Sequence, residues 1–320
     1  MAAPVFLKKG RKVNNYDLFA NHAWYTPGVK GMFGLLGWLI LGSLLGALVL
    51  GVFSVFVPKS VTDQYSMLVL YPLSFLPAMI YAASQSQRNS LFETGYKLTS
   101  SHFGPFKVWQ IVLITIVLTF AYMMGTDYMN YLNLRLTTST PGMKAFYEAF
   151  KEIMSQMVEG PFWSSFLVVA IFAPIFEEWL CRGMVLRGLL TKMKPGWAIV
   201  VSALFFSVIH LNPWQGLNAF CIGLVMGYVY YKTGSLWLTM LIHFVNNGTS
   251  VIAAQFSSLE NMDFWKDVIP GGVYAVVSVV GVAALAACLY AFRRIPLQQE
   301  RGNIDTVELP IPETDATAGA

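Results

Sequence analysis

Two adjacent glutamates lie within a long apolar stretch of the sequence, where ionisable side chains are costly. Glu177 and Glu178 are followed one helical turn later by Arg182. An ionised side chain at the centre of a spanning helix costs roughly 3 kcal/mol on insertion scales, so such residues usually face a polar cavity and serve a function. Their placement predicts an active site inside the membrane.

Two later apolar stretches carry histidines. His210 lies near the end of one of them, and His243 lies within another, with Asn247 one turn after it. At about 1.5 Å of rise per residue, Glu178 and His210 lie roughly 20 Å, and His243 roughly 16 Å, from the cytoplasmic ends of their helices. Three helices are therefore expected to bring polar groups to a similar depth.

These residue types suit hydrolysis by an activated water. Residues four apart share a helical face, so Glu178 is expected beside Arg182. By the same spacing, His243 shares a face with Asn247. Glu177 projects about 100° around the helix from Glu178, so the two carboxylates can serve different partners. A carboxylate and an imidazole can activate water, while an imidazole and an amide can donate hydrogen bonds to a developing oxyanion.

Each of these residues taken singly also has a structural interpretation. Glu178 and Arg182 can form an ion pair between packed helices. His210 and Asn247 can hydrogen-bond between helices, and Phe206 can be a core residue. Four ionisable groups and an amide at one depth would cost roughly 10 kcal/mol if uncompensated, which favours a functional cavity.

The composition indicates an integral membrane protein of the all-α class. The 320 residues are 56% hydrophobic and 12% charged, and the charged share is about half that of a soluble protein. The three cysteines lie apart in apolar stretches, which predicts packing residues rather than disulfides or a thiolate metal site. The basic residues flank apolar segments, as in membrane orientation, and do not indicate nucleic-acid binding.

Apolar runs of spanning length predict about eight transmembrane helices around an intramembrane polar cavity. They cover residues 32–57, 66–84, 107–124, 163–190, 197–212, 216–231, 235–255 and 271–292. Lysine and arginine are concentrated on one side of these spans, which predicts that both chain termini are cytoplasmic.

Three regions follow from this pattern. Residues 1–31 are expected to form a cytoplasmic N-terminal segment, and residues 32–294 the transmembrane domain. Residues 295–320 are polar and contain three prolines, so we expect a disordered cytoplasmic tail. Within the domain, residues 143–158 have apolar residues at helical spacing opposite charged ones, which predicts an amphipathic helix on the membrane surface. The pattern favours a passive interfacial helix over a lid that controls the entry of substrate.

Three short motifs stand in order on these apolar helices. They are EExxxR at 177–182, FxxxH at 206–210 and HxxxN at 243–247. In this order the chain resembles the CPBP family of intramembrane proteases, also described as the Abi or type II CAAX prenyl endopeptidase family. The resemblance covers residues 161–254.

The resemblance implies a role for each motif residue. Glu177 would activate the water together with His210, while His243 and Asn247 would stabilise the oxyanion. Glu178 and Arg182, the other two charged residues of the first motif, would orient the site. Phe206 would form a wall of the substrate pocket.

The family has members described as metalloproteases and members described as glutamate-dependent without metal. Two glutamates and two histidines can hold Zn²⁺. The sequence has no HExxH motif, and asparagine is a poor zinc ligand, so we favour a metal-free site with zinc as the alternative.

The expected partners are membrane lipid and a peptide or protein substrate in the membrane, including lipidated ones. The compact loops favour a bacterial inner membrane. A proton-coupled transporter is one alternative, although the inverted repeats typical of transporters are not evident. A non-proteolytic scaffold or immunity protein is another.

Overall fold

The predicted all-α class is confirmed by the structure. The computed structural model describes residues 25–89, 102–158, 161–255 and 264–297. These residues form helices joined by short connections, and they contain no strand. The predicted N-terminal segment and C-terminal tail lie mostly outside the described residues.

The helices follow one another along the chain with few long connections. In order they are α2 (Val29–Phe56), α3 (Lys59–Asn89), α4 (Val108–Thr137), α5 (Pro141–Val158), α6 (Phe162–Ser165), η1 (Phe166–Phe172), α7 (Ala173–Glu178), η2 (Trp179–Leu186), α8 (Arg187–Leu190), α9 (Pro195–Ile209), α10 (Pro213–Thr233), α11 (Leu236–Ala253), η4 (Trp265–Asp267) and α12 (Gly271–Arg293).

Six helical segments in the described part of the chain are long and apolar enough to cross a membrane. They are Val29–Phe56, Gln64–Gln85, Val108–Thr137, Phe162–Leu190, Leu236–Ala253 and Gly271–Arg293. α9 is apolar but shorter, with 15 residues, and α10 is not among the six. The chain is thus a multi-pass membrane protein, and the predicted number of eight spans is not confirmed.

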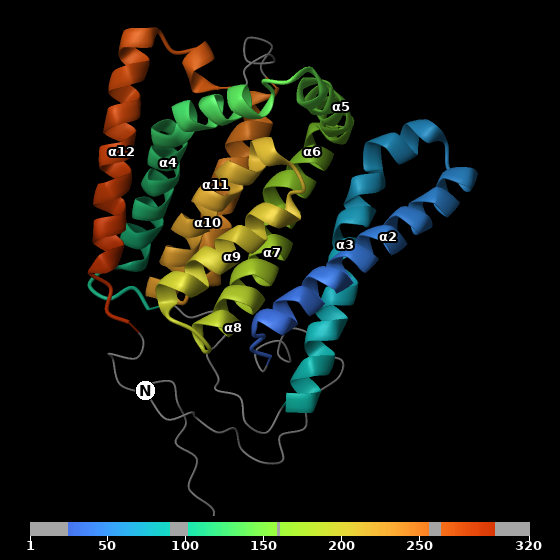
Figure 1. Ribbon diagram of the computed structural model, residues 1–320, viewed down its shortest axis with the longest axis horizontal. Helices are drawn as coiled ribbons and strands as arrows, with labels where there is room; N and C mark the ends of the chain where they lie inside the picture. The colour runs from blue at the N-terminus through green and yellow to red at the C-terminus, as the bar shows by residue number, and fades with distance from the viewer. Residues whose placement is uncertain (1–24, 90–101, 159–160, 256–263, 298–320) are drawn as a thin grey trace, which may run out of the picture.

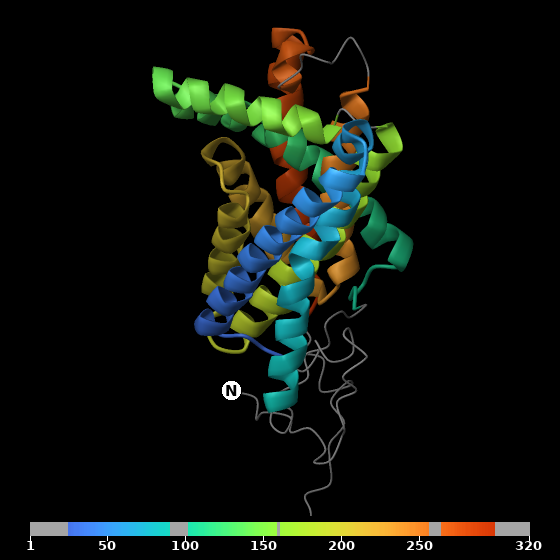
Figure 2. The same ribbon diagram turned by 90° about the vertical axis from the view of Figure 1, so that its right-hand side faces the viewer.

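The helices that carry the three motifs lie in the middle of the molecule. Figure 1 shows the α2–α3 hairpin on one side of this central group and the α4–α12 pair on the other. In Figure 2, α5 runs across one end of the bundle at a steep angle to the other helices. The motif-bearing helices are therefore flanked on both sides by helices from outside the motif region.

The segment from Phe162 to Leu190 is one continuous helical rod, but it is not a regular α-helix. η1 and η2 are π-helical, and the short α7 lies between them. The backbone N–H of Ala173 bonds to Val168, and that of Arg187 bonds to Arg182, each five residues back. The predicted span at residues 163–190 is present as this rod, and wide π turns flank the two glutamates within it. Such turns are frequent at functional sites.

Helix α4 is longer than the sequence predicts. The predicted span ends at residue 124, whereas α4 continues to Thr137 and contains Asp127, which is buried. The Asp127 carboxylate accepts hydrogen bonds from the backbone N–H groups of Trp265 and Lys266 and from the Tyr274 hydroxyl. Asp127 thus lies beyond the predicted end of this span but within α4, where these donors satisfy its charge.

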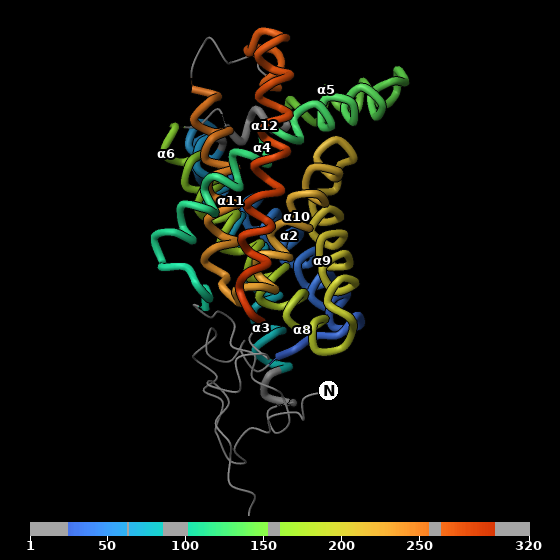
Figure 3. Tube along the Cα trace, turned by 90° about the vertical axis from the view of Figure 1, so that its left-hand side faces the viewer, coloured from blue at the N-terminus to red at the C-terminus, as the bar shows by residue number. Residues whose placement is uncertain are grey.

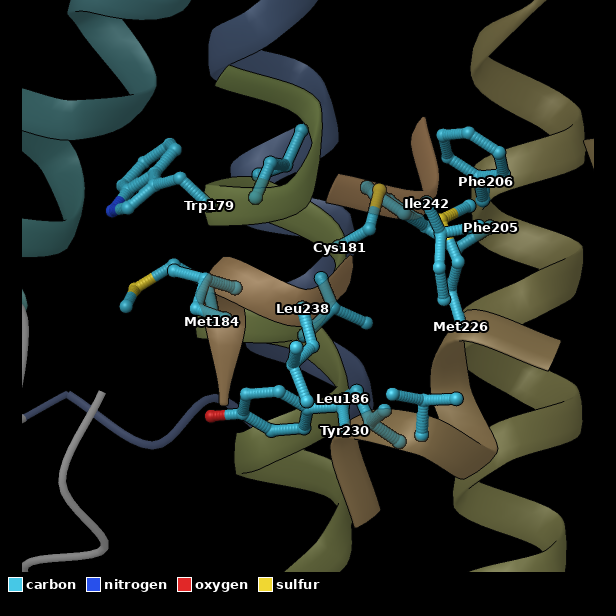
Figure 4. Close-up of a cluster of buried hydrophobic side chains, with 14 of the residues drawn as sticks. Trp179, Cys181, Met184, Leu186, Phe205, Phe206, Met226, Tyr230, Leu238 and Ile242 are labelled. Carbon is cyan, nitrogen blue, oxygen red and sulfur yellow. The ribbon is translucent and has the colours of Figure 1, made fainter. Parts of the chain in front are cut away.

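The core between the central helices is densely packed and apolar. Figure 4 shows this cluster, in which η2, α9, α10 and α11 each contribute side chains. Its labelled members are Trp179, Cys181, Met184, Leu186, Phe205, Phe206, Met226, Tyr230, Leu238 and Ile242. Cys181 is fully buried there as a free thiol, and the other two cysteines are also free. All three are thus packing residues, as predicted.

The predicted amphipathic segment forms α5, which is fastened to the bundle by an aromatic cluster. Trp214 at the start of α10 is buried and lies edge-on to three rings of α5. Its ring centroid lies 5.3 Å from that of Phe146, 5.2 Å from that of Tyr147 and 5.4 Å from that of Phe150. Figure 3 shows α5 reaching sideways past the end of α9 and α10.

Replacing Trp214 by Ala is expected to destabilise the protein by roughly 2 to 4 kcal/mol, because it removes three aromatic contacts and leaves a void. Thermal unfolding of the purified protein in detergent measures the loss. Trp237→Ala is the control, since Trp237 is 67% exposed and should tolerate the change. Equal losses in the two variants would show that the cluster does not fasten α5.

Candidate active site

Glu178 is the most deeply buried acid of the candidate site, and one of its two carboxylate oxygens accepts two hydrogen bonds. Its Oε1 accepts hydrogen bonds from Arg182 at 2.5 Å and from Nδ1 of His243 at 3.0 Å. Both side chains of the Glu178–Arg182 pair are fully buried. The predicted pairing of these two residues on one helical face is therefore present.

Arg182 connects this acid to two further helices. Its guanidinium donates to the backbone carbonyl of Gly223 on α10 at 3.2 Å. Its Cζ atom also lies 4.5 Å from the centre of the Phe206 ring on α9. Arg182 thus stays inside the bundle and holds α9, α10 and η2 together, rather than reaching for the membrane interface.

Glu177 has a different environment from its neighbour. Its side chain is 14% exposed, and its Oε1 accepts a hydrogen bond from the hydroxyl of Tyr71 on α3. Its Oε2 is buried and has no hydrogen-bond partner among the described residues. That atom lies 4.0 Å from Nε2 of His243. One carboxylate oxygen is therefore held in place, while the other is available to a small molecule such as water.

His243 lies between the two glutamates. Its Nδ1 contacts Glu178 and its Nε2 faces Glu177, and the side chain is 6% exposed. A carboxylate can only accept a hydrogen bond, so Nδ1 carries a proton in this arrangement. With both glutamates ionised and both histidines neutral, the two carboxylates and Arg182 together carry one negative charge in excess.

Asn247 lies one turn beyond His243 and is oriented by the π-helical segment. Its Nδ2 donates to the backbone carbonyl of Val169 in η1 at 3.0 Å, and its Oδ1 accepts from Asn246 at 3.1 Å. A side-chain amide has two N–H donors, so one remains after the bond to Val169. Asn247 can therefore still donate to a bound group.

The sequence predicts that His210 lies within a helix that runs to residue 212. In the structure α9 ends at Ile209, so His210 lies directly after the helix. Its Nδ1 lies 2.7 Å from the carbonyl oxygen of Phe206. Since a carbonyl only accepts, Nδ1 carries the proton and Nε2 of the neutral ring is a proton acceptor. No hydrogen bond or ion pair joins His210 to Glu177 within the described residues, so their predicted cooperation stays a prediction.

Phe206 contacts both histidines. Its ring centre lies 4.8 Å from that of His210 and 5.6 Å from that of His243, both in edge-on geometry. Together with its contact to Arg182, this places Phe206 at the centre of the polar cluster. Arg182 of η2, His243 of α11 and His210 at the end of α9 therefore lie around one aromatic ring. Glu178 of α7 joins them through its bonds to Arg182 and His243.

The turn after His210 is held by a residue that sequence reasoning missed. Asn212 caps α10 by accepting the backbone N–H of Gln215, and its Nδ2 donates to the His210 carbonyl at 2.8 Å. Between them, Leu211 has a φ of 55°, which is rare for a residue other than glycine. The Asn-Pro pair that begins α10 is a sequence signal for this cap.

The glutamates and histidines of the site are residue types that can bind a metal ion. The residues that the structure describes contain no group of three or more His, Cys, Asp or Glu side chains that fits a metal ion. Oε1 of Glu178 is shared between a guanidinium and an imidazole, which are cationic or proton-donating partners. Oε2 of the same carboxylate has no hydrogen-bond partner within the described residues.

Comparison with known protein families supports the motif assignment. The family model described as type II CAAX prenyl endopeptidase Rce1-like matches residues 159–249, which include all three motifs. The resemblance predicted from the sequence is thus confirmed over this segment. No curated protein and no solved structure matches the chain. The match and the apolar helical architecture support a CAAX-type intramembrane protease in general.

Replacing Arg182 by Met is expected to destabilise the protein by about 3 to 5 kcal/mol, because it leaves the Glu178 carboxylate buried without its cation. The double variant Glu178→Gln/Arg182→Met should lose less, since no unpaired charge remains. Thermal unfolding in detergent of the parent, the single variants Glu178→Gln and Arg182→Met, and the double variant measures both effects. Additive losses would contradict the ion pair as the main stabilising contact.

Proposed function

Because residues 159–249 match the Rce1-like family, we propose that the chain is an endopeptidase that hydrolyses a peptide bond within the membrane. One observation carries this proposal. Glu177 has one oxygen fixed by Tyr71 and a second, buried oxygen that has no hydrogen-bond partner among the described residues and lies 4.0 Å from Nε2 of His243. This is the arrangement expected of a general base that must bind a water.

In the proposed reaction, Oε2 of Glu177 accepts a proton from the attacking water. The water oxygen forms the new bond to the carbonyl carbon of the substrate, and the carbonyl oxygen becomes negatively charged. The proton held by Glu177 then passes to the leaving amine as the C–N bond breaks. His210 can share the proton transfer, because its Nδ1 is engaged and its Nε2 is an acceptor.

The developing oxyanion needs donors, for which His243 and Asn247 are proposed. Since Nδ1 of His243 is engaged by Glu178, donation from Nε2 requires the imidazolium form. Asn247 contributes its second N–H. Donors that are fixed before the reaction typically account for a large share of such catalysis.

The remaining motif residues support this geometry. Glu178 and Arg182 hold His243 and the end of α7 in place through the buried network. Phe206 separates the two imidazoles and is proposed as a wall of the substrate pocket. A buried network of this kind fixes side-chain orientation because any displacement leaves a charge unpaired.

We propose that the reaction needs no metal ion. The support is the pairing of Oε1 of Glu178 with Arg182 and His243, and the lack, within the described residues, of three His, Cys, Asp or Glu side chains grouped as metal ligands. The zinc-dependent version of the same protease is the alternative, and the two make opposite predictions about chelators.

The proposed substrate is a membrane-associated or lipidated peptide or protein, because the site lies among helices that are apolar enough to cross a bilayer. Such a substrate can reach the helices from the surrounding lipid. We further propose a location in a bacterial inner membrane with both termini in the cytoplasm, based on the distribution of lysine and arginine.

Replacing Glu177 by Gln is expected to lower the rate of peptide cleavage by roughly 10²- to 10⁴-fold, because the amide cannot accept a proton from water. Cleavage of a panel of membrane peptides by the purified protein measures the effect. Glu148→Gln is the control, since Glu148 lies exposed on α5 and should cleave at the parental rate. Parental activity of Glu177→Gln would exclude the general-base role. A parent chain that cleaves no peptide would favour the scaffold or immunity alternative.

Chelation is expected to leave the activity unchanged. The purified protein is treated with a zinc chelator, dialysed into metal-free buffer and assayed for cleavage, with metal analysis of the same sample. Full activity without bound metal is the expected result. Loss of activity that added Zn²⁺ restores would establish the zinc-dependent alternative.

A further inference from the structure

Tyr71 is the one residue of the α2–α3 hairpin whose hydrogen bond reaches a proposed catalytic group in the described part of the chain. Its hydroxyl donates to Oε1 of Glu177, across 106 residues of sequence. Tyr71 lies outside the segment 159–249 that matches the family model. The contact therefore links α3 to the general base that the motif helices carry.

The surroundings of this hydrogen bond are aromatic. The Tyr71 ring lies 5.5 Å from that of Phe75 and 6.5 Å from that of Phe176, between ring centres. Phe75 and Phe176 stack on each other at 5.3 Å, and Phe172 meets Phe176 edge-on at 6.1 Å. The Phe75 and Phe176 rings pack against the Tyr71 ring and restrict its orientation, and the Tyr71 hydroxyl provides Oε1 of Glu177 with a hydrogen bond.

The two neighbouring carboxylates are thus held by different donors. Glu178 binds a guanidinium and an imidazole, whereas the hydrogen bond of Glu177 comes from the Tyr71 hydroxyl. A partly buried carboxylate without a donor is costly, and it rotates to find one. A donor fixed on Oε1 prevents this rotation and keeps Oε2 beside the imidazole of His243.

We propose that Tyr71 is a positioning residue for the hydrolytic reaction: it holds Oε1 of Glu177 so that Oε2 is presented to the attacking water. This inference rests on the proposed function of Glu177. It makes α3 a part of the active site, so the site is incomplete in the motif helices alone. Tyr71 acts through Glu177 and needs no contact with the substrate.

A purely structural role for this hydrogen bond makes a different prediction. If the Tyr71 hydroxyl only attaches the α2–α3 hairpin to α7, removing another contact between the hairpin and the rod should lower kcat by a similar factor. Ser164 provides such a contact, because its buried hydroxyl donates to the Gln64 carbonyl of α3 at 3.2 Å. Tyr65 provides a second comparison, because its ring stacks on Trp163 at 5.6 Å and carries a hydroxyl on the same helix.

The test compares Tyr71→Phe, Tyr65→Phe and Ser164→Ala in the full chain, purified in one detergent, with cleavage rates measured well below each melting temperature. Tyr71→Phe keeps the ring and removes only the donor. It is expected to lower kcat roughly 10- to 100-fold, as for loss of a hydrogen bond to a charged group, and to leave KM within about twofold. Tyr65→Phe and Ser164→Ala are expected to keep the parental kcat, and Ser164→Ala to lower the melting temperature.

Each other result has a distinct meaning. Parental kcat in Tyr71→Phe would overturn the positioning role and leave the proposed protease intact. An equal loss of kcat in Ser164→Ala would also overturn it, because hairpin attachment would then explain the effect. A rise in KM with unchanged kcat would assign Tyr71 to substrate binding and overturn positioning. An inactive parent chain would instead overturn the proposed function, and the catalytic role of Tyr71 with it.

Discussion

The buried contact of Glu178 with Arg182 and His243 is the interaction on which the arrangement of the central helices depends. A charge removed from both water and lipid must be paired, and each partner here comes from a defined place in the fold. Arg182 lies in the same helical rod as Glu178 and also bonds the Gly223 carbonyl of α10, while His243 comes from α11. Sliding or rotating any of these helices would leave a buried charge unpaired. The network therefore fixes the relative positions of the helices more strictly than apolar packing among lipid-like side chains can.

The π-helical turns on either side of α7 shape the site in a second way. In a π turn the backbone bonds skip one residue further than in an α-helix, so the face presented to neighbouring helices changes within one turn. η1 offers the Val169 carbonyl to Asn247, which fixes the amide one turn beyond His243. Pro174 has no backbone N–H and stands next to the end of η1, where a regular ladder would need that donor. The irregular backbone thus has a local cause, and it orients a residue proposed to bind the oxyanion.

Much of this arrangement could be predicted from residue spacing, and the rest depends on contacts that spacing does not encode. The apolar runs gave the helices, and the four-residue interval gave the Glu178–Arg182 pair, because both follow from the period of a helix. The predicted length of α4 is too short, because a charged residue such as Asp127 normally marks the end of an apolar run. Its hydrogen-bond donors lie in the distant η4 segment, and residue spacing does not indicate them. Tyr71 could not be assigned at all. A single tyrosine in an apolar span has no periodic partner, and its acceptor lies 106 residues away.

The two adjacent glutamates illustrate how position alone separates chemical roles. Glu177 and Glu178 have the same side chain, but successive residues point about 100° apart on a helix, so each faces a different set of neighbours. Glu178 points toward Arg182 and His243 and is fully buried, which commits its charge to holding the helices. Glu177 points toward α3, where an aromatic cluster and one hydroxyl hold a single oxygen and leave the other without a partner. A base needs a lone pair that no donor occupies, and only Glu177 combines such an oxygen with partial exposure and a nearby imidazole. Oε2 of Glu178 also has no hydrogen-bond partner among the described residues, but that side chain is fully buried and its charge is paired with Arg182. The assignment of the base to Glu177 therefore follows from the different burial and charge pairing of two chemically identical neighbours.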